Sequence, residues 1–539
     1  MRIVEVAYSL PAETFIQRHA EALYRAGVDL ILVARSKTDP KNANASIADD
    51  IFEIPAAIMP TWAHMKIGEK LSTLRYALFH LHRSPHKLRY KALLAFFERL
   101  KPDLIHFHTA RYAASLGWVP RALGIPYTVS VRGSDIQVFP LRSREMAREI
   151  ARALRRATLV HAVCDHLGDL IQILFGTRLP VRTIYTTVPV PPNLPDYEPP
   201  NNRLHFLSVG RLMWRKAHVD LLSAVAWLKK EGLPAHLTLI GSGVDEQRIL
   251  WWMKRFRLQG NVDFPGRVPA NRLPQMYSRA TAFVQSSIAE GFSNAVAEAM
   301  AWGCPVFATA VGGTAEIIRD GENGFLLPPL QPERWTEKLS LARERTVMQQ
   351  VREAAYETAR KYFSPQQHAE AFVSFFEEAI RRGTTPRTTS QAYGSENGYQ
   401  HELANNLTSF DDVCLLIRGE WRWENGADLI LRALAPLVRN QRMCLIFQGK
   451  GPQEDELRYL ARFLDIDKKV IFFNSEEDFE NKTKYTRKEI PVLYINNAQN
   501  QGWWLQRSER VLGRIPFGNL KLLILLCSQA LNSSLQLGV

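Results

Sequence analysis

Strand and helix patterns alternate along most of this chain, in two blocks that a proline-rich segment separates. In the first block, short apolar runs typical of buried strands are separated by longer stretches with helical periodicity. The alternation predicts a doubly wound parallel sheet, and such sheets bind ligands at the carboxyl ends of their strands. The predicted strands are Ile3 to Tyr8, Val28 to Ala34, Leu104 to Phe107, Tyr127 to Val131 and Leu159 to Val163, and the predicted helices include Glu13 to Gly27, Lys87 to Lys101 and Arg142 to Ala157.

The second block follows residues 188–202, where six of fifteen residues are proline, a composition that indicates a stiff connection between domains. We therefore expect an α/β protein with a first domain over 1–188, a linker over 189–203 and a second domain over 204–382. With 539 residues, 46% of them hydrophobic, the chain is long enough for three domains with full cores. The predicted strands of the second domain are Phe206 to Val209, Leu237 to Ile240, Val262 to Phe264, Ala282 to Gln285 and Pro305 to Ala308, and a helix from Pro365 to Arg381 closes it.

The most informative motif runs from Glu290 to Glu316 and reads E-G-F-S-N-x3-E-A-M-A-x-G-x-P-V-x5-G-G-x2-E. Ser293 or Asn294 can cap a helix whose N-terminus would direct unpaired N–H groups and a positive dipole end toward an anion. A pair of glycines, Gly312 and Gly313, lets backbone approach such an anion closely. The pattern is that of a diphosphate-sugar site, and the alternative is a capped amphipathic helix with solvated carboxylates.

Two cations stand at the first strand-to-helix turn of the second domain. Arg211 and Lys216 are five residues apart there, so both could hold a diphosphate while its leaving charge develops.

Together these motifs resemble the signature of the family-4 retaining glycosyltransferases, which have the GT-B fold of two Rossmann-like domains facing a cleft. The resemblance covers about residues 1–382. It implies that Arg211 and Lys216 stabilise the diphosphate, that Glu290 holds donor-sugar hydroxyls and that Glu298 holds the ribose. The family usually has glycine after the lysine, where this chain has Ala217. The positions that the resemblance assigns to donor or nucleotide binding are Gly210, Arg267, Val268, Gly291, Phe292, Ser293, Glu298, Gly312 and Gly313.

Two strings in the first domain resemble the branch of this family that assembles extracellular polysaccharide. They are Ser9-Leu-Pro-Ala-Glu13-Thr14-Phe15 and Ile105-His106-Phe-His108-Thr109. The resemblance implies a catalytic role for His108, whose alternative is a core histidine at a strand end. Arg132 stands where many relatives carry a histidine, and it can hydrogen-bond a phosphate or acceptor but cannot serve as a base. The residues expected on the acceptor side are Glu13, Thr14, Arg132 and Asp135.

No side chain in these motifs is an obvious nucleophile for a double displacement of the kind that retaining glycosidases use. We therefore expect a retaining hexosyltransferase of the EC 2.4 class, in which the acceptor attacks from the face that the leaving phosphate departs from. The expected donor is a UDP-, GDP- or ADP-sugar, the expected acceptor is a glycan or lipid-linked saccharide in polysaccharide biosynthesis, and no metal cofactor is expected. The alternative function is a non-catalytic scaffold that binds nucleotide sugar or a partner transferase.

The end of the chain resembles part of the second domain. Residues 383–410 are typical of a flexible linker, and residues 413–429 then resemble residues 206–221. An offset of 208 places Gly419 and Glu424 where Arg211 and Lys216 stand, so the anion-binding pair is lost. We expect a degenerate partial repeat of the donor domain over 411–475 and a divergent tail over 476–539; the alternative is an extra α/β module with a binding role.

The formal net charge of +14 has several explanations. Between His64 and Lys101, nine Lys or Arg and two Glu are interleaved with apolar residues, as on helices that bind an anionic membrane surface. The alternative is an ordinary amphipathic helix, whose apolar stripe packs in the protein core and whose charged face is solvated. No nucleic-acid-reading module accompanies the charge.

Because neither a leader pattern nor a spanning apolar segment is present, the sequence predicts a cytoplasmic protein. If the basic helices bind lipid, this protein would be peripheral on the inner face of the membrane.

Overall fold

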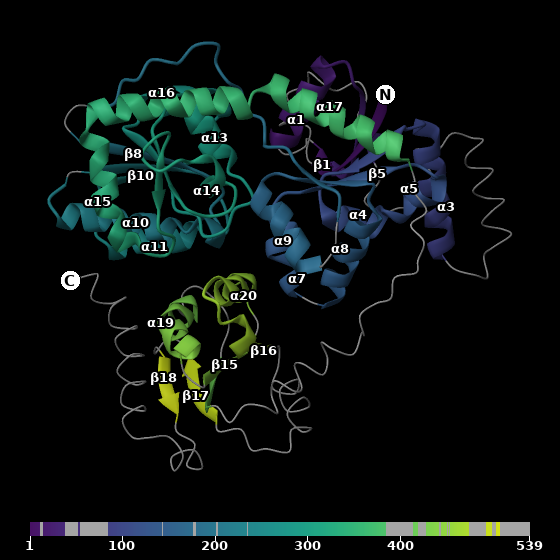
Figure 1. Cartoon of the computed structure of the whole chain (residues 1–539). Coiled ribbons are helices and arrows are strands. Elements are labelled where there is room, and N and C mark those ends of the chain that lie inside the picture. Colours follow the sequence, from purple (N-terminus) through teal and green to yellow (C-terminus); the bar gives the residue numbers. More distant parts are fainter. Residues whose placement is uncertain are drawn as a thin grey trace. The chain divides into compact units, whose positions relative to one another are not determined.

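The structure is a computed structural model, and Figure 1 shows its elements along the chain. It describes residues 1–10, 14–37, 52–53, 85–142, 144–175, 179–200, 203–233, 235–383, 413–418, 427–440, 443–449, 451, 453–473, 492–497 and 503–506. By their contacts, these residues form two compact units: 1–244 with 258–386, and 245–257 with 387–539.

The first domain of the first unit is a seven-stranded sheet in the order β3-β2-β1-β4-β5-β6-β7, with every neighbouring pair parallel. Its helices cover both faces of the sheet (Figure 1). The strands are β1 (Arg2–Leu10), β2 (Asp29–Lys37), β3 (Phe52–Glu53), β4 (Leu104–Phe107), β5 (Tyr127–Val131), β6 (Leu159–Ala162) and β7 (Val181–Thr183). The helices are α1 (Thr14–Arg25), α3 (Pro85–Leu100), α4 (Ala110–Leu116), α5 (Trp118–Leu123), α6 (Ser134–Gln137), α7 (Phe139–Arg142), α8 (Arg144–Arg156) and α9 (Asp165–Phe175).

The second domain is a six-stranded parallel sheet in the order β10-β9-β8-β11-β12-β13. Its strands are β8 (Leu204–Val209), β9 (Ala235–Ile240), β10 (Val262–Gly266), β11 (Ala282–Gln285), β12 (Val306–Thr309) and β13 (Phe325–Leu327). The α-helices of this part of the sequence are α10 (His218–Lys230), α11 (Glu246–Arg255), α12 (Leu273–Arg279), α13 (Asn294–Ala301), α14 (Thr314–Ile317), α15 (Trp335–Ser340), α16 (Arg345–Tyr362) and α17 (Pro365–Arg382), and the 3-10 helices are η4 (Trp214–Lys216), η5 (Ala270–Arg272), η6 (Pro332–Arg334) and η7 (Leu341–Arg343).

The predicted fold class, two doubly wound parallel sheets, is confirmed, because in both sheets the first strand is the third in the order and the strand order reverses beside it. The edge strands β7 and β13 have three residues each and were not predicted.

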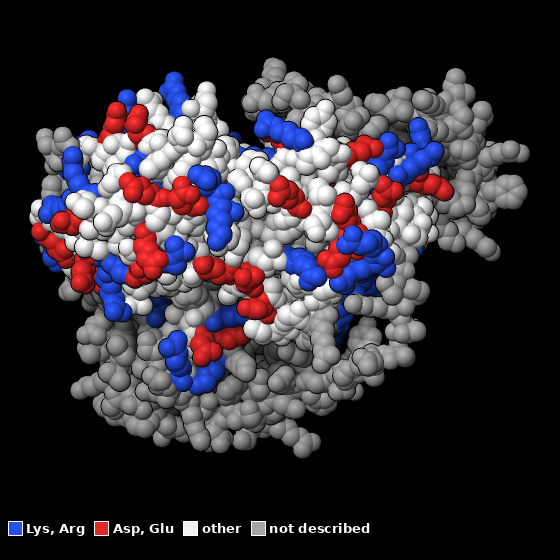
Figure 2. All heavy atoms as spheres, turned by 45° about the horizontal axis from the view of Figure 1, so that its top comes forward, with Lys and Arg blue, Asp and Glu red and all other residues white. Residues whose placement is uncertain are grey.

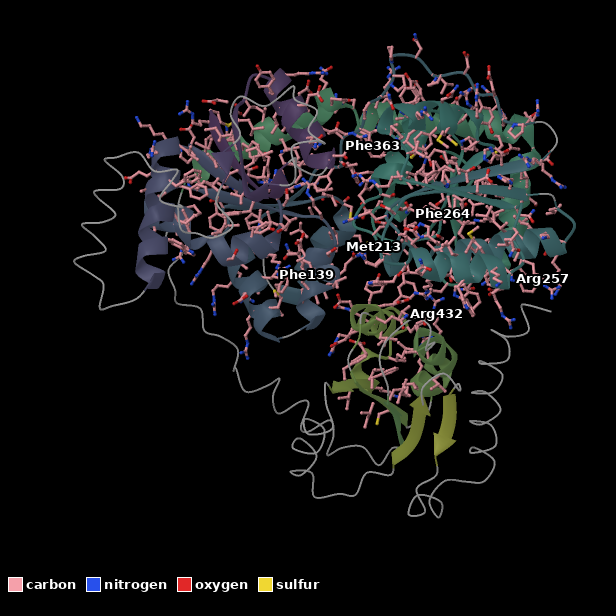
Figure 3. The ribbon with its side chains drawn as sticks, turned by 180° about the vertical axis from the view of Figure 1, so that it is seen from behind. Phe139, Met213, Arg257, Phe264, Phe363 and Arg432 are labelled. Atoms are coloured by element: carbon pink, nitrogen blue, oxygen red, sulfur yellow. The ribbon has the colours of Figure 1, made fainter. Side chains whose placement is uncertain are left out.

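The chain crosses back to the first domain after α16. Phe363, labelled in Figure 3, is fully buried at this point, and its carbonyl oxygen accepts hydrogen bonds from the Val188 amide at 3.0 Å and the Thr187 hydroxyl at 3.1 Å. The following helix, α17, packs Phe372 and Phe376 into an apolar cluster with residues of the first sheet. The closing helix is therefore part of the core of the first domain.

The second unit contains a five-stranded sheet in the order β16-β15-β14-β17-β18, in which β18 alone is antiparallel to its neighbour. Within this unit Arg248 of α11 is buried between Asp428 at 2.9 Å and Glu456 at 3.2 Å. The strands are β14 (Val413–Arg418), β15 (Met443–Gln448), β16 (Val470–Phe473), β17 (Val492–Asn497) and β18 (Trp503–Gln506), with helices α19 (Ala427–Asn440), α20 (Glu454–Phe463) and η9 (Asp467–Lys469).

Two strands of this sheet, β17 and β18, come from residues 476–539, which the sequence analysis set apart as a tail. The order β16-β15-β14-β17 matches the order β10-β9-β8-β11 of the second domain. A partial repeat would produce this match, and the repeat itself stays a prediction.

The described surface carries both signs of charge. On the face shown in Figure 2, Lys and Arg side chains alternate with Asp and Glu. Most of the basic segment between His64 and Lys101 lies outside the described residues, so its role at a membrane stays a prediction. Among the helices that the structure describes, none combines the length and the apolar character needed to cross a bilayer.

Candidate functional site

The loop after β11 lies directly against the first domain. The Gln137 side-chain amide donates a hydrogen bond to the Glu290 carbonyl oxygen at 3.0 Å, and the Cys164 thiol donates to that of Gly291 at 3.1 Å. A β-carbon on Gly291 would stand 2.2 Å from the carbonyl oxygen of Arg132, so only glycine fits. The carboxyl ends of the two sheets thus meet backbone to backbone, and we call residues 132–137 and 286–293 the interdomain junction.

Glu290 and Lys216 form an ion pair at this junction. The Lys216 ammonium donates to Glu290 Oε1, and the Ser287 hydroxyl donates to the same oxygen at 2.6 Å. Both charged side chains keep some exposure, 20% for Lys216 and 11% for Glu290. The structure therefore brings together two of the predicted catalytic residues, whereas Arg211, the second predicted cation, is exposed.

Helix α13 begins as the motif predicts. Ser293 is its N-cap, because the hydroxyl oxygen accepts a hydrogen bond from the Val296 amide at 3.4 Å, and the hydroxyl donates to the side chain of Gln285. Just before the cap, the Phe292 ring packs 5.2 Å from the ring of Phe363. This packing fixes the direction in which the loop enters the helix.

Glu298 lies near the middle of α13 and is held by two partners. Tyr277 donates its hydroxyl to one carboxylate oxygen at 3.2 Å, and Arg18 of the first domain pairs with the other at 2.6 Å. Burial, and secondarily the Glu298 charge, raises the pKa of Tyr277 well above its ordinary value, so this phenol stays a donor. The residue predicted to hold a ribose is thus in contact with both domains.

The Gly312-Gly313 loop packs on the Glu290 loop. The Gly313 amide donates to the Gly291 carbonyl oxygen at 2.8 Å. Gly312 has a φ of +52°, and a β-carbon there would stand 2.1 Å from the Glu290 carbonyl oxygen. A β-carbon on Gly313 would stand 2.6 Å from Cβ of Cys164 and 2.8 Å from the Phe292 ring, so close approach of protein atoms explains both glycines.

Glu316, the last carboxylate of the motif, contacts the first domain. It accepts hydrogen bonds from the backbone amides of Asp165 at 2.9 Å and His166 at 2.5 Å, and from the Tyr185 hydroxyl at 3.3 Å. These amides belong to the first turn of α9, where a negative charge is stabilised by the unpaired N–H groups. Glu316 therefore holds the two domains together.

The remaining predicted positions are peripheral to these contacts. Gly210 directly follows β8, and its amide donates to the Ile240 carbonyl oxygen at 2.9 Å. Arg267 is exposed and Val268 half-buried after β10, while Thr14 is exposed at the start of α1. Glu13 lies outside the described residues.

On the first-domain side, Arg132 lies between His108 and Phe15. Its guanidinium nitrogen Nη2 is 3.4 Å from His108 Nδ1, and its carbon Cζ is 4.4 Å from the centre of the Phe15 ring. The Arg132 amide donates to Asp135 at 3.2 Å. Burial raises the pKa of Asp135 to about 6, although this hydrogen bond opposes the shift.

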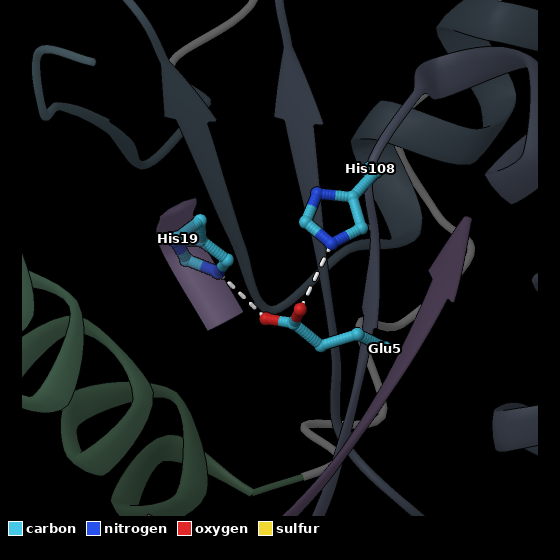
Figure 4. Close-up of side chains that lie close together, drawn as sticks. All are labelled: Glu5, His19 and His108. Atoms are coloured by element: carbon cyan, nitrogen blue, oxygen red, sulfur yellow. Dashed lines mark hydrogen bonds and ion pairs between the residues drawn. The ribbon is translucent and has the colours of Figure 1, made fainter. Parts of the chain in front are cut away.

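His108 does not fit the alternative of a core histidine satisfied by backbone. Its Nε2 atom is 2.9 Å from one carboxylate oxygen of Glu5, and His19 Nε2 is 2.7 Å from the other (Figure 4). All three side chains are buried, and their ligand atoms lie within 4.8 Å of one another. Two ligands of a tetrahedral zinc would be about 3.3 Å apart. The shorter distances here are those of hydrogen bonds, so we do not assign these residues as metal ligands.

The sequence analysis missed several residues that complete these contacts. Glu5 had a usable signal, because it is a single carboxylate within the apolar run of β1. Arg18, Gln137 and Tyr277 had none, since each meets its partner across 21 to 280 residues, whereas Ser287 is only three residues from Glu290 and was still not predicted.

Comparison with known families matches both domains. Residues 12–187 match the family described as "Glycosyl transferase 4-like domain", and residues 192–362 match "Glycosyl transferases group 1". Among proteins of known sequence, the chain is 24% identical over 356 residues to WcaL of Escherichia coli K12, a glycosyltransferase named for colanic acid biosynthesis, covering 60% of this chain and 85% of WcaL. It is 26% identical over 299 residues to TuaC of Bacillus subtilis 168, named for teichuronic acid biosynthesis, covering 53% of this chain and 74% of TuaC.

Two solved structures share the arrangement of the first unit. HepE of Anabaena, solved in complex with UDP and glucose, has a TM-score of 0.55 at 18% identity, covering 70% of this chain and 99% of HepE. Sucrose-phosphate synthase of Thermosynechococcus elongatus has a TM-score of 0.56 at 18% identity, covering 71% of this chain and 100% of the synthase. At these identities the likeness shows a shared fold.

Proposed function

Residues 12–362 form a two-domain glycosyltransferase of the GT-B fold, and on that premise we propose that the chain transfers a hexosyl group from a nucleotide-diphosphate sugar with retention of configuration. The observation that carries the proposal is the Lys216–Glu290 ion pair at the interdomain junction. In the proposed roles, Lys216 would hold a diphosphate and Glu290 would hold sugar hydroxyls, where both domains can reach one ligand.

In the proposed reaction, an acceptor hydroxyl oxygen forms a bond to the anomeric carbon while the bond from that carbon to the diphosphate breaks. The acceptor proton passes to the departing phosphate oxygen, so no protein nucleophile takes part. Lys216, with Arg211, stabilises the negative charge that develops on the diphosphate. Because these side chains supply the positive charge, we propose a reaction without a metal, and activity is expected to persist in a chelator.

The carboxylates have the other roles. Glu290 would exchange its bond to Lys216 for hydroxyls of the donor sugar, and Glu298 would accept from the ribose between Tyr277 and Arg18. On the first-domain side, Arg132 and Asp135 would receive the acceptor.

Donor and acceptor classes are proposed from the relatives. HepE was solved with UDP and glucose, which favours a UDP-hexose as donor. WcaL and TuaC are named for colanic acid and teichuronic acid biosynthesis, which favours a growing or lipid-linked polysaccharide as acceptor. We further propose the cytoplasmic face of the membrane as the place of action.

The test is release of free nucleoside diphosphate from a panel of UDP-, GDP- and ADP-hexoses. Lys216→Ala is expected to lower kcat by about 100- to 1000-fold, since a positioned charge at the leaving group is lost. Lys361→Ala, which removes an exposed ammonium from α16, is the matched control and should leave kcat unchanged. Equal kcat for the two variants would contradict the assignment of Lys216.

The competing function is a non-catalytic scaffold. The exposed position of Arg211, outside the Lys216–Glu290 pair, is the observation in its favour. Thermal stabilisation by nucleotide together with no turnover of any donor would support the scaffold.

A further inference from the structure

A chain of buried hydrogen bonds runs from the interdomain junction to the closing helix α17. At its centre Glu5 lies within β1 with no exposed surface, and each carboxylate oxygen faces one histidine, His19 or His108 (Figure 4). His19 Nδ1 is 2.8 Å from His368 Nε2, and His368 Nδ1 is 2.9 Å from the Tyr185 carbonyl oxygen.

The fixed acceptor at one end decides where the protons are. A carbonyl oxygen can only accept, so His368 Nδ1 must carry a proton. Burial, and then the charge of His19, holds the pKa of His368 well below its ordinary value, so the ring is neutral and Nε2 accepts. His19 Nδ1 must therefore donate to it. His19 Nε2 faces a carboxylate oxygen at 2.7 Å and must donate as well. With protons on both nitrogens, His19 is an imidazolium.

The other end of the chain is equally determined. Burial lowers the pKa of His108 to about 4, so this ring is neutral. Its Nε2 atom donates to Glu5, which leaves the lone pair of Nδ1 directed toward the Arg132 guanidinium at 3.4 Å. The opposite tautomer would set two donors against each other. The carbonyl oxygen of Arg132 in turn lies against Gly291, beside Glu290.

We propose that Glu5 and His19 form a buried ion pair, and that Glu5 positions Arg132 at the interdomain junction by accepting a hydrogen bond from His108. The positioning role rests on the proposed transferase function. Glu5 is a positioning residue, since it has no exposed surface for a substrate. Its oxygen toward His108 fixes one His108 tautomer, and so one guanidinium orientation for the acceptor or phosphate.

A second chain of buried hydrogen bonds in the same sheet provides the matched control. His106 lies two residues before His108 on β4, is equally buried, and bonds Thr128 at 2.7 Å and Ser130 at 2.9 Å. Ser130 leads to His161, which donates to the Ile184 carbonyl oxygen at 2.8 Å. No hydrogen bond described for this second chain reaches Arg132.

The protonation states of His19 and His108 are tested by ¹⁵N NMR of the full chain labelled with ¹⁵N-histidine, with no sugar donor present. Spectra of His19→Gln and His108→Gln assign the two rings, because each variant lacks the signals of one of them. The expected result is a His19 ring with both nitrogens protonated and a His108 ring protonated at Nε2 alone. In Glu5→Gln, His19 should become neutral, because the amide donates to it, while the His108 tautomer stays. A neutral His19 in the wild type would overturn the proposal. So would a stoichiometric bound metal by mass spectrometry.

The positioning role is tested by kinetics. Glu5→Leu removes the acceptor of His108, and kcat is expected to fall about 10- to 100-fold with little change in KM for the donor, which other residues hold. Glu5→Gln keeps that acceptor and should restore most of kcat. His106→Asn should lower stability but leave kcat unchanged. An equal loss of kcat in Glu5→Leu and His106→Asn would show a merely structural role.

The two proposals fail separately. Absence of turnover in the wild type would refute the transferase function and with it the positioning role, yet the NMR result would still decide whether the Glu5–His19 ion pair exists. If Glu5→Leu does not fold, the wild-type and Glu5→Gln measurements still test the proposal.

Discussion

Ala217, which follows Lys216, has a backbone conformation that side chains rarely adopt. Its φ of +45° and ψ of +43° lie in the left-handed region, where it begins α10. A residue with a β-carbon costs roughly 1–2 kcal/mol there. Glycine would adopt this conformation without strain, which gives a physical reason for the glycine that the family resemblance leads one to expect at this position.

We therefore expect Ala217→Gly to raise the free energy of unfolding of the first unit by about 1 kcal/mol, after the higher chain entropy of glycine in the unfolded state is deducted. Urea denaturation followed by fluorescence measures the difference. Ala224→Gly, in the interior of the same helix, is the control and should lower stability by about 1 kcal/mol. If Ala217→Gly lowered stability as Ala224→Gly does, the backbone of Ala217 would not be strained.

At the residue scale, the sequence predicts what depends on near neighbours. The Ser293 cap could be read from the motif because its bond spans three residues. The Arg18–Glu298 pair spans 280 residues, and nothing local to either residue indicates it. His108 is buried, as the core-histidine alternative has it, but its partner Glu5 lies 103 residues away and could not be identified from the local sequence.

At the scale of elements, α17 shows how a helix can follow one domain and stabilise another. Its first residues come directly after the second domain, but Phe372, Phe375 and Phe376 pack against the first sheet. The sequence predicted a helix from Pro365 to Arg381 that closes the second domain, and in the structure these aromatic side chains join the core of the first domain. Edge strands β7 and β13 could not be predicted, because three residues give too short a pattern to distinguish strand from loop.

Phe376→Ala is expected to lower the free energy of unfolding by about 3–5 kcal/mol, since it removes a fully buried ring from this cluster. Equilibrium unfolding in urea measures the change. Glu377→Ala, one residue later and exposed, is the control, with an expected effect within about 0.5 kcal/mol. If Phe376→Ala had an equally small effect, α17 would not be part of the first-domain core.

For the whole molecule, the division into two sheets followed from strand and helix alternation, which is repeated over hundreds of residues and is therefore hard to mistake. The extent of the last sheet did not follow, because β17 and β18 come from sequence without a clear strand period. The place of β17 is decided by its pairing with β14, a contact across more than seventy residues, and β18 then pairs with β17.

Buried neutral histidines give the first unit a common response to acid. Burial holds the pKa of His106, His161 and His368 well below the ordinary value, that of His108 at about 4 and that of His218 at about 3. The unfolded chain takes up these protons near pH 6.5. Stability is therefore fully present above about pH 6.5 and is lost as the pH falls toward the folded-state values.

We expect the free energy of unfolding to fall between pH 6.5 and 5, with each such histidine adding up to about 1.4 kcal/mol per pH unit to the slope. Urea denaturation at several pH values measures it. His218→Asn should make the slope shallower by up to that amount, independently of the opposite contribution of Asp135, whose pKa is raised to about 6. An unchanged slope would mean that His218 is already protonated in the folded chain.

In the proposed reaction, Glu290 and the donor diphosphate compete for the same ammonium group of Lys216. A donor diphosphate would have to displace the Glu290 carboxylate from Lys216, and breaking this ion pair would weaken donor binding. The same carboxylate would return to Lys216 as the nucleotide product leaves. Glu290 would thus lower the affinity for the nucleoside diphosphate product and shorten the time that this product stays bound, which favours turnover over tight binding.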